Sequence, residues 1–127
     1  MKKGLRLEDL EVYKVAMEIG DIVWDIVLRW DYFARKTLGA QSVDAADSIA
    51  FNISEGYGRF HYKENKNFCY YSRGSAKETL TGVNKAKKRN LITDEEFNLL
   101  SQKLEFYFRL MHGYIKSIGN SNEDNDM

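Results

Sequence analysis

The sequence predicts an all-α protein, an antiparallel up-down-up-down bundle of four helices, from three observations. The 127-residue chain contains no proline, which favours long uninterrupted helices. Apolar residues recur at alternating steps of three and four near both ends of the chain, as on one face of a helix. Only short polar connections separate the helical stretches, and short connections make neighbouring helices antiparallel. We expect one bundle domain over residues 1–118 and a disordered acidic tail over residues 119–127.

The first expected helix runs from about Leu10 to Trp30 and carries two apolar stripes. The first stripe is a heptad seam for the core: Val12, Ala16, Ile19, Val23, Ile26 and Trp30. The second stripe, roughly 120° around the helix, consists of Tyr13, Met17, Trp24 and Leu28. A helix in a single bundle needs an apolar surface little more than ~100° wide, about half of what this helix carries. We therefore expect the second stripe to be buried against another chain.

The second expected helix follows a connection over residues 31–39 and ends near Glu55. Thr37 is its candidate N-cap, and Gly56 and Gly58 are expected to break it. Polar residues form a stripe of their own along this helix: Gln41, Asp44, Ser48, Asn52, Glu55 and Arg59. Short polar groups beside small residues are typical of a buried or interfacial hydrogen-bond ladder.

Because an unpaired buried polar group costs roughly 1–3 kcal/mol, this stripe is expected to have partners. The predicted structural network comprises Gln41, Ser48, Asn52, Glu55, Arg59, Arg73, Ser75 and Glu78. Within it, Glu55 should bridge to one of the two arginines, while Ser48 and Asn52 should bond the serine or the glutamate of the third helix. The alternative is an active site built from Glu55, Glu78 and Asp44. The structural interpretation is favoured, since a buried polar network can specify register and assembly without chemistry.

The third expected helix runs from Tyr62 or Lys63 to about Arg89. Its middle is small, which lets another helix approach closely: Ser72, Gly74, Ser75 and Ala76. The single cysteine, Cys69, fits a reducing cytoplasm. It is expected to be a small core or interface residue, because no histidine or dense basic cluster flanks it.

The fourth expected helix opens with a capping box, with Thr93 as N-cap and Glu96 at the third helical position. Its heptad seam consists of Phe97, Leu100, Leu104, Tyr107, Met111, Tyr114 and Ile118. A second apolar ridge of Leu99, Phe106 and Leu110 again exceeds what one core uses. The candidate oligomer interface therefore comprises Tyr13, Met17, Trp24, Leu28, Leu99, Phe106 and Leu110.

Charge is unevenly distributed, although the formal net charge is zero. Between residues 8 and 31, seven acidic residues against two basic ones give a net charge of −5. Between residues 57 and 92, nine basic residues against two acidic ones give +7. Either the two regions lie side by side and complement each other, or the basic region binds phosphates. The first interpretation is favoured, because the sequence pI of about 6.7 argues against a dedicated nucleic-acid binder.

Motifs for catalysis are missing from the sequence. His61 and His112 lack the spacing of a metal site, and there is no Glu-x-x-His pair, Cys-x-x-Cys pair or P-loop. Both histidines are expected to be ordinary turn or surface residues. We therefore expect a protein that is not an enzyme, with no cofactor, no metal and no small-molecule substrate. No apolar run approaches the roughly 20 residues that span a bilayer, and no apolar signal core follows the first residues, so a cytoplasmic protein is expected.

Two motifs resemble a known family. The run Asn52-Ile53-x-Glu55-Gly56-x-Gly58-Arg59 and the run Arg73-Gly74-Ser75-Ala76-x-Glu78 are similar to those of the 23S ribosomal RNA intervening-sequence family. The likeness extends over nearly the whole chain. Accessory variability determinant proteins of diversity-generating retroelements are relatives of that family. The resemblance implies a small cytoplasmic bacterial four-helix bundle that assembles into a pentameric ring and, less directly, RNA or DNA binding. Members commonly carry two arginines where this chain has Val43 and Asp44.

Two functional interpretations remain. The first is a non-enzymatic homo-oligomer that acts as a scaffold or adaptor for a protein partner. The alternative is an RNA- or DNA-binding accessory protein, with Tyr57, Phe60 or Tyr62 available to stack bases. Its candidate nucleic-acid contacts are Arg59, Lys63, Lys66, Lys85, Lys87, Lys88 and Arg89.

Overall fold

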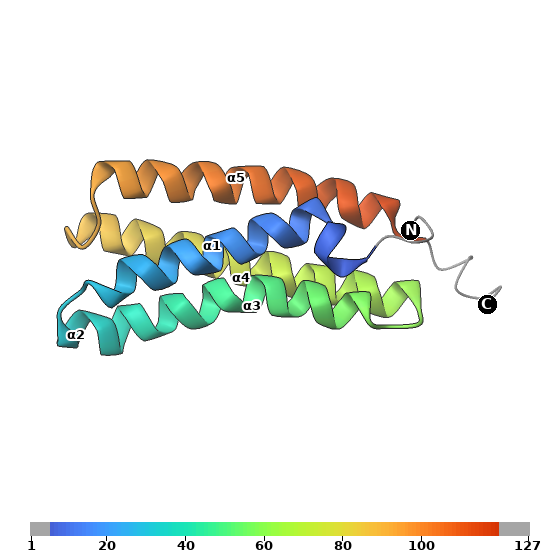
Figure 1. Ribbon diagram of the computed structural model, residues 1–127, viewed down its shortest axis with the longest axis horizontal. Helices are drawn as coiled ribbons and strands as arrows, with labels where there is room; N and C mark the ends of the chain where they lie inside the picture. Colours follow the sequence, from blue (N-terminus) through green and yellow to red (C-terminus); the bar gives the residue numbers. More distant parts are fainter. Residues whose placement is uncertain (1–5, 120–127) are drawn as a thin grey trace.

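The computed structural model describes residues 6–119, and within this range the chain is all-helical, as predicted. Four long helices form the bundle (Figure 1): α1 (Glu11–Leu28), α3 (Ala40–Tyr57), α4 (Tyr62–Lys88) and α5 (Asp94–Ser117). Three short elements are η1 (Leu7–Asp9), α2 (Tyr32–Ala34) and the π-helical segment η2 (Arg35–Gly39). Of the predicted tail, residues 120–127 lie outside the described residues.

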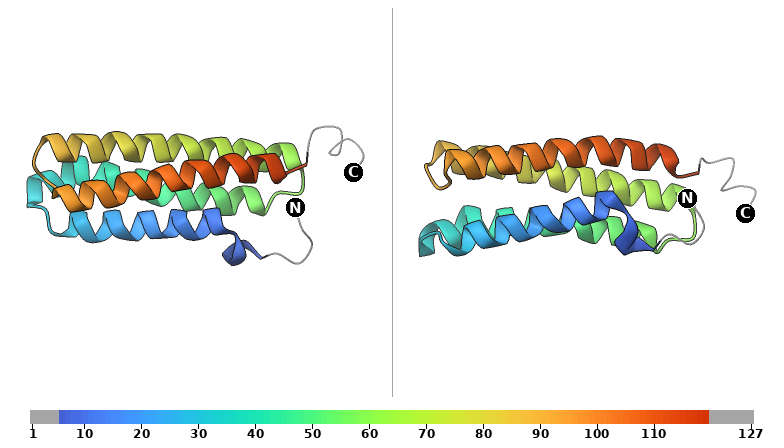
Figure 2. Two further views of the ribbon diagram at one scale, coloured as in Figure 1. Left: turned by 90° about the horizontal axis from the view of Figure 1, so that it is seen from above. Right: turned by 45° about the horizontal axis from the view of Figure 1, so that its top comes forward.

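The four helices pack antiparallel around one core, in the order α1, α3, α4, α5. Helix α1 packs against α3 and α5, and α4 packs against the same two helices from the other side. Figure 2 shows α1 and α3 together in one layer and α4 and α5 in the other. The up-down-up-down arrangement predicted from the short connections is therefore confirmed.

The two heptad seams supply the centre of the core, as predicted. All six residues of the α1 seam are buried, from Val12 to Trp30. In α5 the seam is buried from Leu100 to Ile118, and Phe97 is half-buried at its start. Burying large aliphatic side chains of this kind contributes about 1.5–3 kcal/mol each, so these seams determine which faces of the helices turn inward.

The helical run that leads into α3 begins earlier than predicted. Asp31 is the N-cap of the helical run, because its Oδ1 accepts a hydrogen bond from the Ala34 amide at 2.9 Å. The run continues through α2 and η2 into α3 without a break. Thr37 is inside the run, where its hydroxyl donates to the Phe33 carbonyl at 2.6 Å. The prediction of Thr37 as N-cap is therefore wrong.

Gly56 does not break α3 but is a buried residue of that helix, which ends at Tyr57. A Cβ atom at Gly56 would lie 2.7 Å from Oδ1 of Asn65 and 2.8 Å from Cβ of Phe68. Glycine is thus required by the close approach of α4. Gly58 is the C-cap and has a right-handed backbone conformation, with φ of −78°.

The predicted start of α5 is confirmed. The Thr93 hydroxyl accepts from the Glu96 amide at 3.0 Å, and the Glu96 carboxylate accepts from the Thr93 amide at 2.9 Å. Burial alone would raise the pKa of Glu96, but hydrogen bonds from Arg29 and from the Thr93 amide outweigh it and hold that pKa below its usual value.

The acidic and basic regions do not complement each other side by side. The acidic region is mainly α1 and the basic region mainly α4, and these two helices lie diagonally across the core. Helix α1 pairs instead with α5: Nζ of Lys103 lies 2.8 Å from Oε2 of Glu18. The preferred interpretation of the charge asymmetry is therefore wrong, and each region remains available at its own surface.

Candidate interaction surfaces

A groove between α1 and α3 contains the second apolar stripe of α1. Two cavities open along it, of about 280 Å³ and about 400 Å³. The α1 residues that line them are Tyr13, Ala16, Met17, Gly20, Asp21, Trp24, Val27 and Leu28. The α3 residues are Ala40, Val43, Asp44, Asp47, Ala50, Phe51 and Ser54. We call this surface the α1/α3 groove. The whole second stripe, from Tyr13 to Leu28, thus faces α3.

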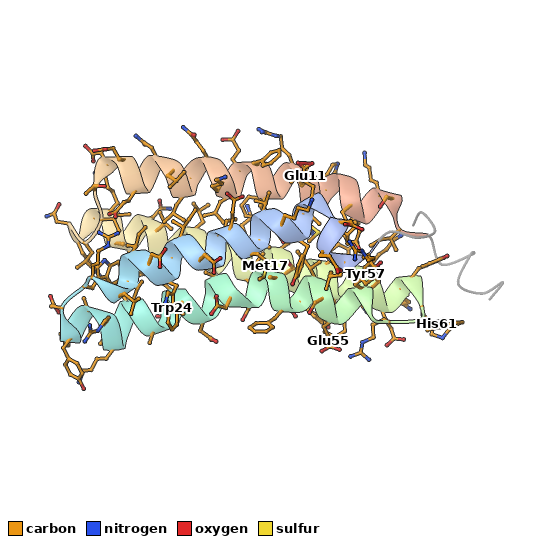
Figure 3. All side chains as sticks on the ribbon, in the orientation of Figure 1. Glu11, Met17, Trp24, Glu55, Tyr57 and His61 are labelled. Atoms are coloured by element: carbon orange, nitrogen blue, oxygen red, sulfur yellow. The ribbon has the colours of Figure 1, made fainter. Side chains whose placement is uncertain are left out.

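Large apolar side chains of the α1/α3 groove are exposed to solvent. Met17, Trp24 and Leu28 are 46%, 52% and 53% exposed, and Phe51 of α3 is 70% exposed. Figure 3 shows Met17 and Trp24 on the side of α1 that is next to α3. A contiguous apolar surface of this kind marks an interaction site more often than scattered single residues do.

The groove is also acidic. Asp21, Asp44 and Asp47 line it, and the one cation in its lining is Arg35 of η2 at one end. Burial, then the nearby charges of Asp21 and Asp44, raises the pKa of Asp47. The Asp47 carboxylate therefore lacks a compensating cation close by, and a partner that supplied one would find favourable electrostatics.

The apolar ridge of α5 lies on the opposite side of α1. Leu99 is exposed, and Phe106 and Leu110 are half-buried. They share a helix side with Glu96 and Lys103, since these residues recur at steps of three and four. Glu96 and Lys103 pair with α1 through Arg29 and Glu18, so the ridge flanks the α1–α5 contact. The seven predicted interface residues therefore form two surfaces, one on each side of α1.

The predicted polar ladder is not buried in the bundle and does not cross to α4. Gln41, Asp44, Glu55 and Arg59 are exposed, and Ser48 and Asn52 are half-exposed. The Ser48 hydroxyl donates to the Asp44 carbonyl at 2.8 Å, and the Asn52 amide to the Ser48 carbonyl at 2.9 Å. The predicted bonds from Ser48 and Asn52 to Ser75 or Glu78 are therefore replaced by bonds within α3.

Two parts of the predicted network have a clear place in the structure. Glu55 does bridge to Arg59, with Nη2 and Oε2 3.1 Å apart, which is one of the two predicted pairings. The other arginine, Arg73, lies over the ring of Tyr70, 5.1 Å from its centroid. Gln41 and Glu78 line one small groove between α3 and α4.

The interhelical polar network lies in the core, on residues outside the predicted network. The Ser72 hydroxyl donates to the Ile49 carbonyl at 2.8 Å, and it lies 2.6 Å from the Tyr107 hydroxyl. Asn65, also buried, forms a side-chain hydrogen bond with Tyr114, although burial of Tyr114 dominates and raises its pKa to about 12. A pattern in the sequence could have predicted this network. Polar residues of α4 at positions 65, 72 and 79 recur at a helical step of seven, on the same face as Cys69 and Ala76.

The candidate nucleic-acid contacts do not form one patch. Arg59, Lys63 and Lys66 lie near the start of α4, and Lys85 to Arg89 lie at its end. Along the helix, about 29 Å separates Lys66 from Lys85, the nearest members of the two groups on α4. Arg59 is paired with Glu55 and Glu64, and Lys87 with Asp94. These ion pairs reduce the charge that both groups offer to phosphates.

The carboxylates of the alternative active site lie apart. Asp44 lines the α1/α3 groove, whereas Glu78 lines the small groove between α3 and α4. Among the described residues, no group of three or more His, Cys, Asp or Glu side chains could hold a metal ion. Both histidines are exposed, as predicted. Cys69 is buried in the core, where burial raises the pKa of its thiol to about 12.

Comparison with known proteins identifies the family and gives a relative of the same fold. The family model described as 23S rRNA-intervening sequence protein matches residues 8–113. A crystal structure from Bacteroides thetaiotaomicron, of a protein with unknown function from the S23 ribosomal protein family, superimposes with a TM-score of 0.74. It is 17% identical and covers 84% of this chain and 99% of its own, a level of identity that supports the fold alone. A search of curated proteins finds no match. Over residues 6–119, no helix is both long and apolar enough to cross a membrane.

Proposed function

The chain belongs to the 23S rRNA-intervening sequence protein family, and from that premise we propose that it acts as a non-enzymatic homo-oligomeric scaffold. In this proposal, copies of the chain associate through the exposed apolar flanks of α1 and present a composite surface to a protein partner. The observation that carries the proposal is the exposure of Met17, Trp24, Leu28 and Phe51 along one groove.

The physical support is that burial of exposed apolar surface makes association more favourable. Removing apolar surface from water stabilises a contact by roughly 25 cal/mol per Å². Stable complexes bury about 800 Å² on each partner, an area that a groove lined along most of α1 and α3 can contribute to. The acidic lining adds selectivity, because complementary charge favours one partner over others.

Stoichiometry and partner come from the resemblance to the family. The relatives associated with retroelements suggest a pentameric ring that serves as the partner of a reverse transcriptase. For this chain we propose the ring, and a cytoplasmic protein partner for it, on that resemblance.

Binding of RNA or DNA is the second candidate, and one observation favours it: the outward side of α4 carries four exposed lysines against two exposed acids, Glu64 and Glu78. Against it stand the separation of the two basic groups, about 29 Å along the helix, and the ion pairs of Arg59 and Lys87. Titration of a structured RNA at low and at moderate salt tests this candidate. Binding that weakens steeply with salt supports it, and no binding in either condition removes it.

Light scattering coupled to size-exclusion chromatography tests the scaffold itself. The scaffold predicts a particle mass that is a multiple of the 14.8 kDa chain. Trp24→Ser, on the groove, should lower that mass, whereas Phe60→Ser, at an exposed aromatic residue between α3 and α4 and outside the groove, serves as the comparison. A wild-type mass of one chain at all concentrations would contradict the proposal.

A further inference from the structure

From the charge and shape of two surfaces, we infer that the α1/α3 groove binds the outward face of α4 from a second copy of this chain. This inference rests on the proposed homo-oligomer and names the two surfaces that meet in it. It makes the contact heterologous, since the groove and the α4 face are different surfaces of the same chain.

The outward face of α4 carries a regular stripe of exposed residues that is rich in lysine, with the exposed acids Glu64 and Glu78 beside it. At steps of three and four it consists of Lys63, Asn67, Tyr70, Gly74, Lys77, Thr81, Lys85 and Lys88, all exposed. We call this set the α4 seam. Four of its eight members are lysines, and Arg73 lies over the Tyr70 ring at its edge. A basic seam with an aromatic residue is the chemical complement of an acidic groove with exposed apolar side chains.

Gly74 gives the seam a place where another backbone can come close. It lies in the middle of a 27-residue helix, where glycine costs roughly 1 kcal/mol relative to alanine. A Cβ atom at Gly74 would meet nothing within 4 Å, so no packing within the chain requires glycine there. Gly56 differs, since α4 presses directly on it. A contact with a second copy would supply the missing reason for glycine at position 74.

The lengths of the two surfaces match. From Tyr13 to Leu28 the groove follows α1 for about 22 Å, which is about four helical turns. The stretch of the seam from Asn67 to Thr81, centred on Gly74, covers about 21 Å. Lys77, which lies over the Phe108 ring of its own chain, can then reach toward the carboxylates of Asp44 and Asp47, whose cavity lining includes one cation, Arg35.

Each copy offers one groove and one seam, and they lie in different layers of the bundle. Two copies therefore leave one groove and one seam unused, and further copies can add until the assembly closes as a ring.

The test uses one variant for each surface, with a matched control for each. Gly74→Glu puts bulk and negative charge in the seam without a clash in its own chain; Asn98→Glu makes a matching charge change at an exposed site on α5. Asp21→Lys with Asp44→Lys reverses the groove charge; Glu11→Lys with Asp25→Lys makes the same change at exposed sites of α1 outside the groove lining. Circular dichroism confirms that each variant is folded.

In light scattering, both surface variants should have the mass of a single chain at concentrations where the wild type is assembled, a loss of affinity of at least tenfold. Both controls should keep the wild-type mass. When the two surface variants are mixed, the intact groove of Gly74→Glu can accept the intact seam of the groove variant. The mixture should therefore form 1:1 pairs that do not grow further.

Three results would overturn the inference. If wild-type chains assemble and either surface variant keeps the full assembled mass, copies meet elsewhere, while the proposed scaffold stands. If both variants are single chains but their mixture forms no pair, the groove and the seam are not partners. If wild-type chains stay single at every concentration, the scaffold falls with the inference. In that case, binding of a synthetic Lys/Leu amphipathic helix to the groove of the single chains would indicate that the groove binds a different protein.

Discussion

Ser72 and Tyr107 hold α4 and α5 together through hydroxyl groups 2.6 Å apart, inside a core that is otherwise mostly apolar. The Ser72 hydroxyl also donates to the Ile49 carbonyl of α3, so one serine links three helices. Because the Ser72 proton is used in that bond, the Tyr107 hydroxyl donates its own proton to the Ser72 oxygen. Burial of Tyr107 raises the pKa of this phenol, which therefore stays protonated as a donor.

Removing either hydroxyl should have unequal effects on stability. Ser72→Ala leaves the buried Tyr107 hydroxyl without its partner and should lower the free energy of unfolding by about 1–3 kcal/mol. Tyr107→Phe leaves Ser72 bonded to Ile49 and should cost about 1 kcal/mol. The double variant should cost less than the sum of the two, because no unpaired hydroxyl remains. Urea unfolding of all four chains at one protein concentration measures this, and additive losses would show that the two hydroxyls are not coupled.

The cap of α5 should contribute measurably to stability. Thr93→Ala removes the acceptor of the Glu96 amide and should lower the free energy of unfolding by about 1 kcal/mol. Thr37→Ala is the matched control, because Thr37 is exposed within η2 and its hydroxyl donates to carbonyls of its own helical run. Thermal unfolding should separate the two variants, and an equal change in both would argue against the capping box.

Gly56 should not tolerate even a methyl group. In Gly56→Ala the new Cβ would lie 2.8 Å from Cβ of Phe68, so α3 and α4 would have to move apart. We expect a loss of about 1–3 kcal/mol from this overpacking. Gly113→Ala, at a helical glycine with nothing within 4 Å, should instead stabilise by up to about 1 kcal/mol. Equal and favourable effects at both positions would contradict the close approach of α4 to α3.

Asp47 should make stability depend on pH. Burial and neighbouring carboxylates raise its pKa in the folded chain, so the folded state binds this proton more tightly than the unfolded state. Its contribution to stability therefore falls as pH rises from the unfolded pKa of about 3.9 through the folded pKa. Asp47→Asn should raise the unfolding midpoint at pH 7 and leave it unchanged at pH 3. Measuring the chain with and without Asp47→Asn in the Gly74→Glu background keeps the comparison on single chains. If Asp47→Asn lowered the midpoint at pH 7, the folded state would instead stabilise the charged carboxylate.

The apolar periodicity predicted most of the fold, because burial of the seams decides which helix faces turn inward. The burial of the seam residues, from Val12 to Trp30 and from Leu100 to Ile118, was predicted from their spacing alone. The start of the second helix was harder to predict, since Asp31 and Thr37 are both good N-caps and only tertiary packing decides between them. Gly56 was misread for a similar reason: the sequence does not show that α4 lies 2.8 Å from the place of its missing side chain.

The surfaces could be predicted only in part. The second stripe of α1 was found from its spacing, and it is exposed. Its position on the opposite side of α1 from the α5 ridge depends on how the helices are arranged around the core. The polar stripe of α3 was misread, because Ser48 and Asn52 can satisfy their side chains on the carbonyls of their own helix. The charges of α1 and α4 were expected to meet, and the diagonal placement of these helices keeps them apart.

The mass of the wild-type chain in solution tests the central claim most directly. Light scattering across a dilution series from about 100 µM to about 1 µM, a range that brackets micromolar dissociation constants, measures it without any variant. If exposed Met17, Trp24, Leu28 and Phe51 are covered by other copies, the upper end of the series will give a multiple of 14.8 kDa. A constant mass of 14.8 kDa throughout the series would contradict the account.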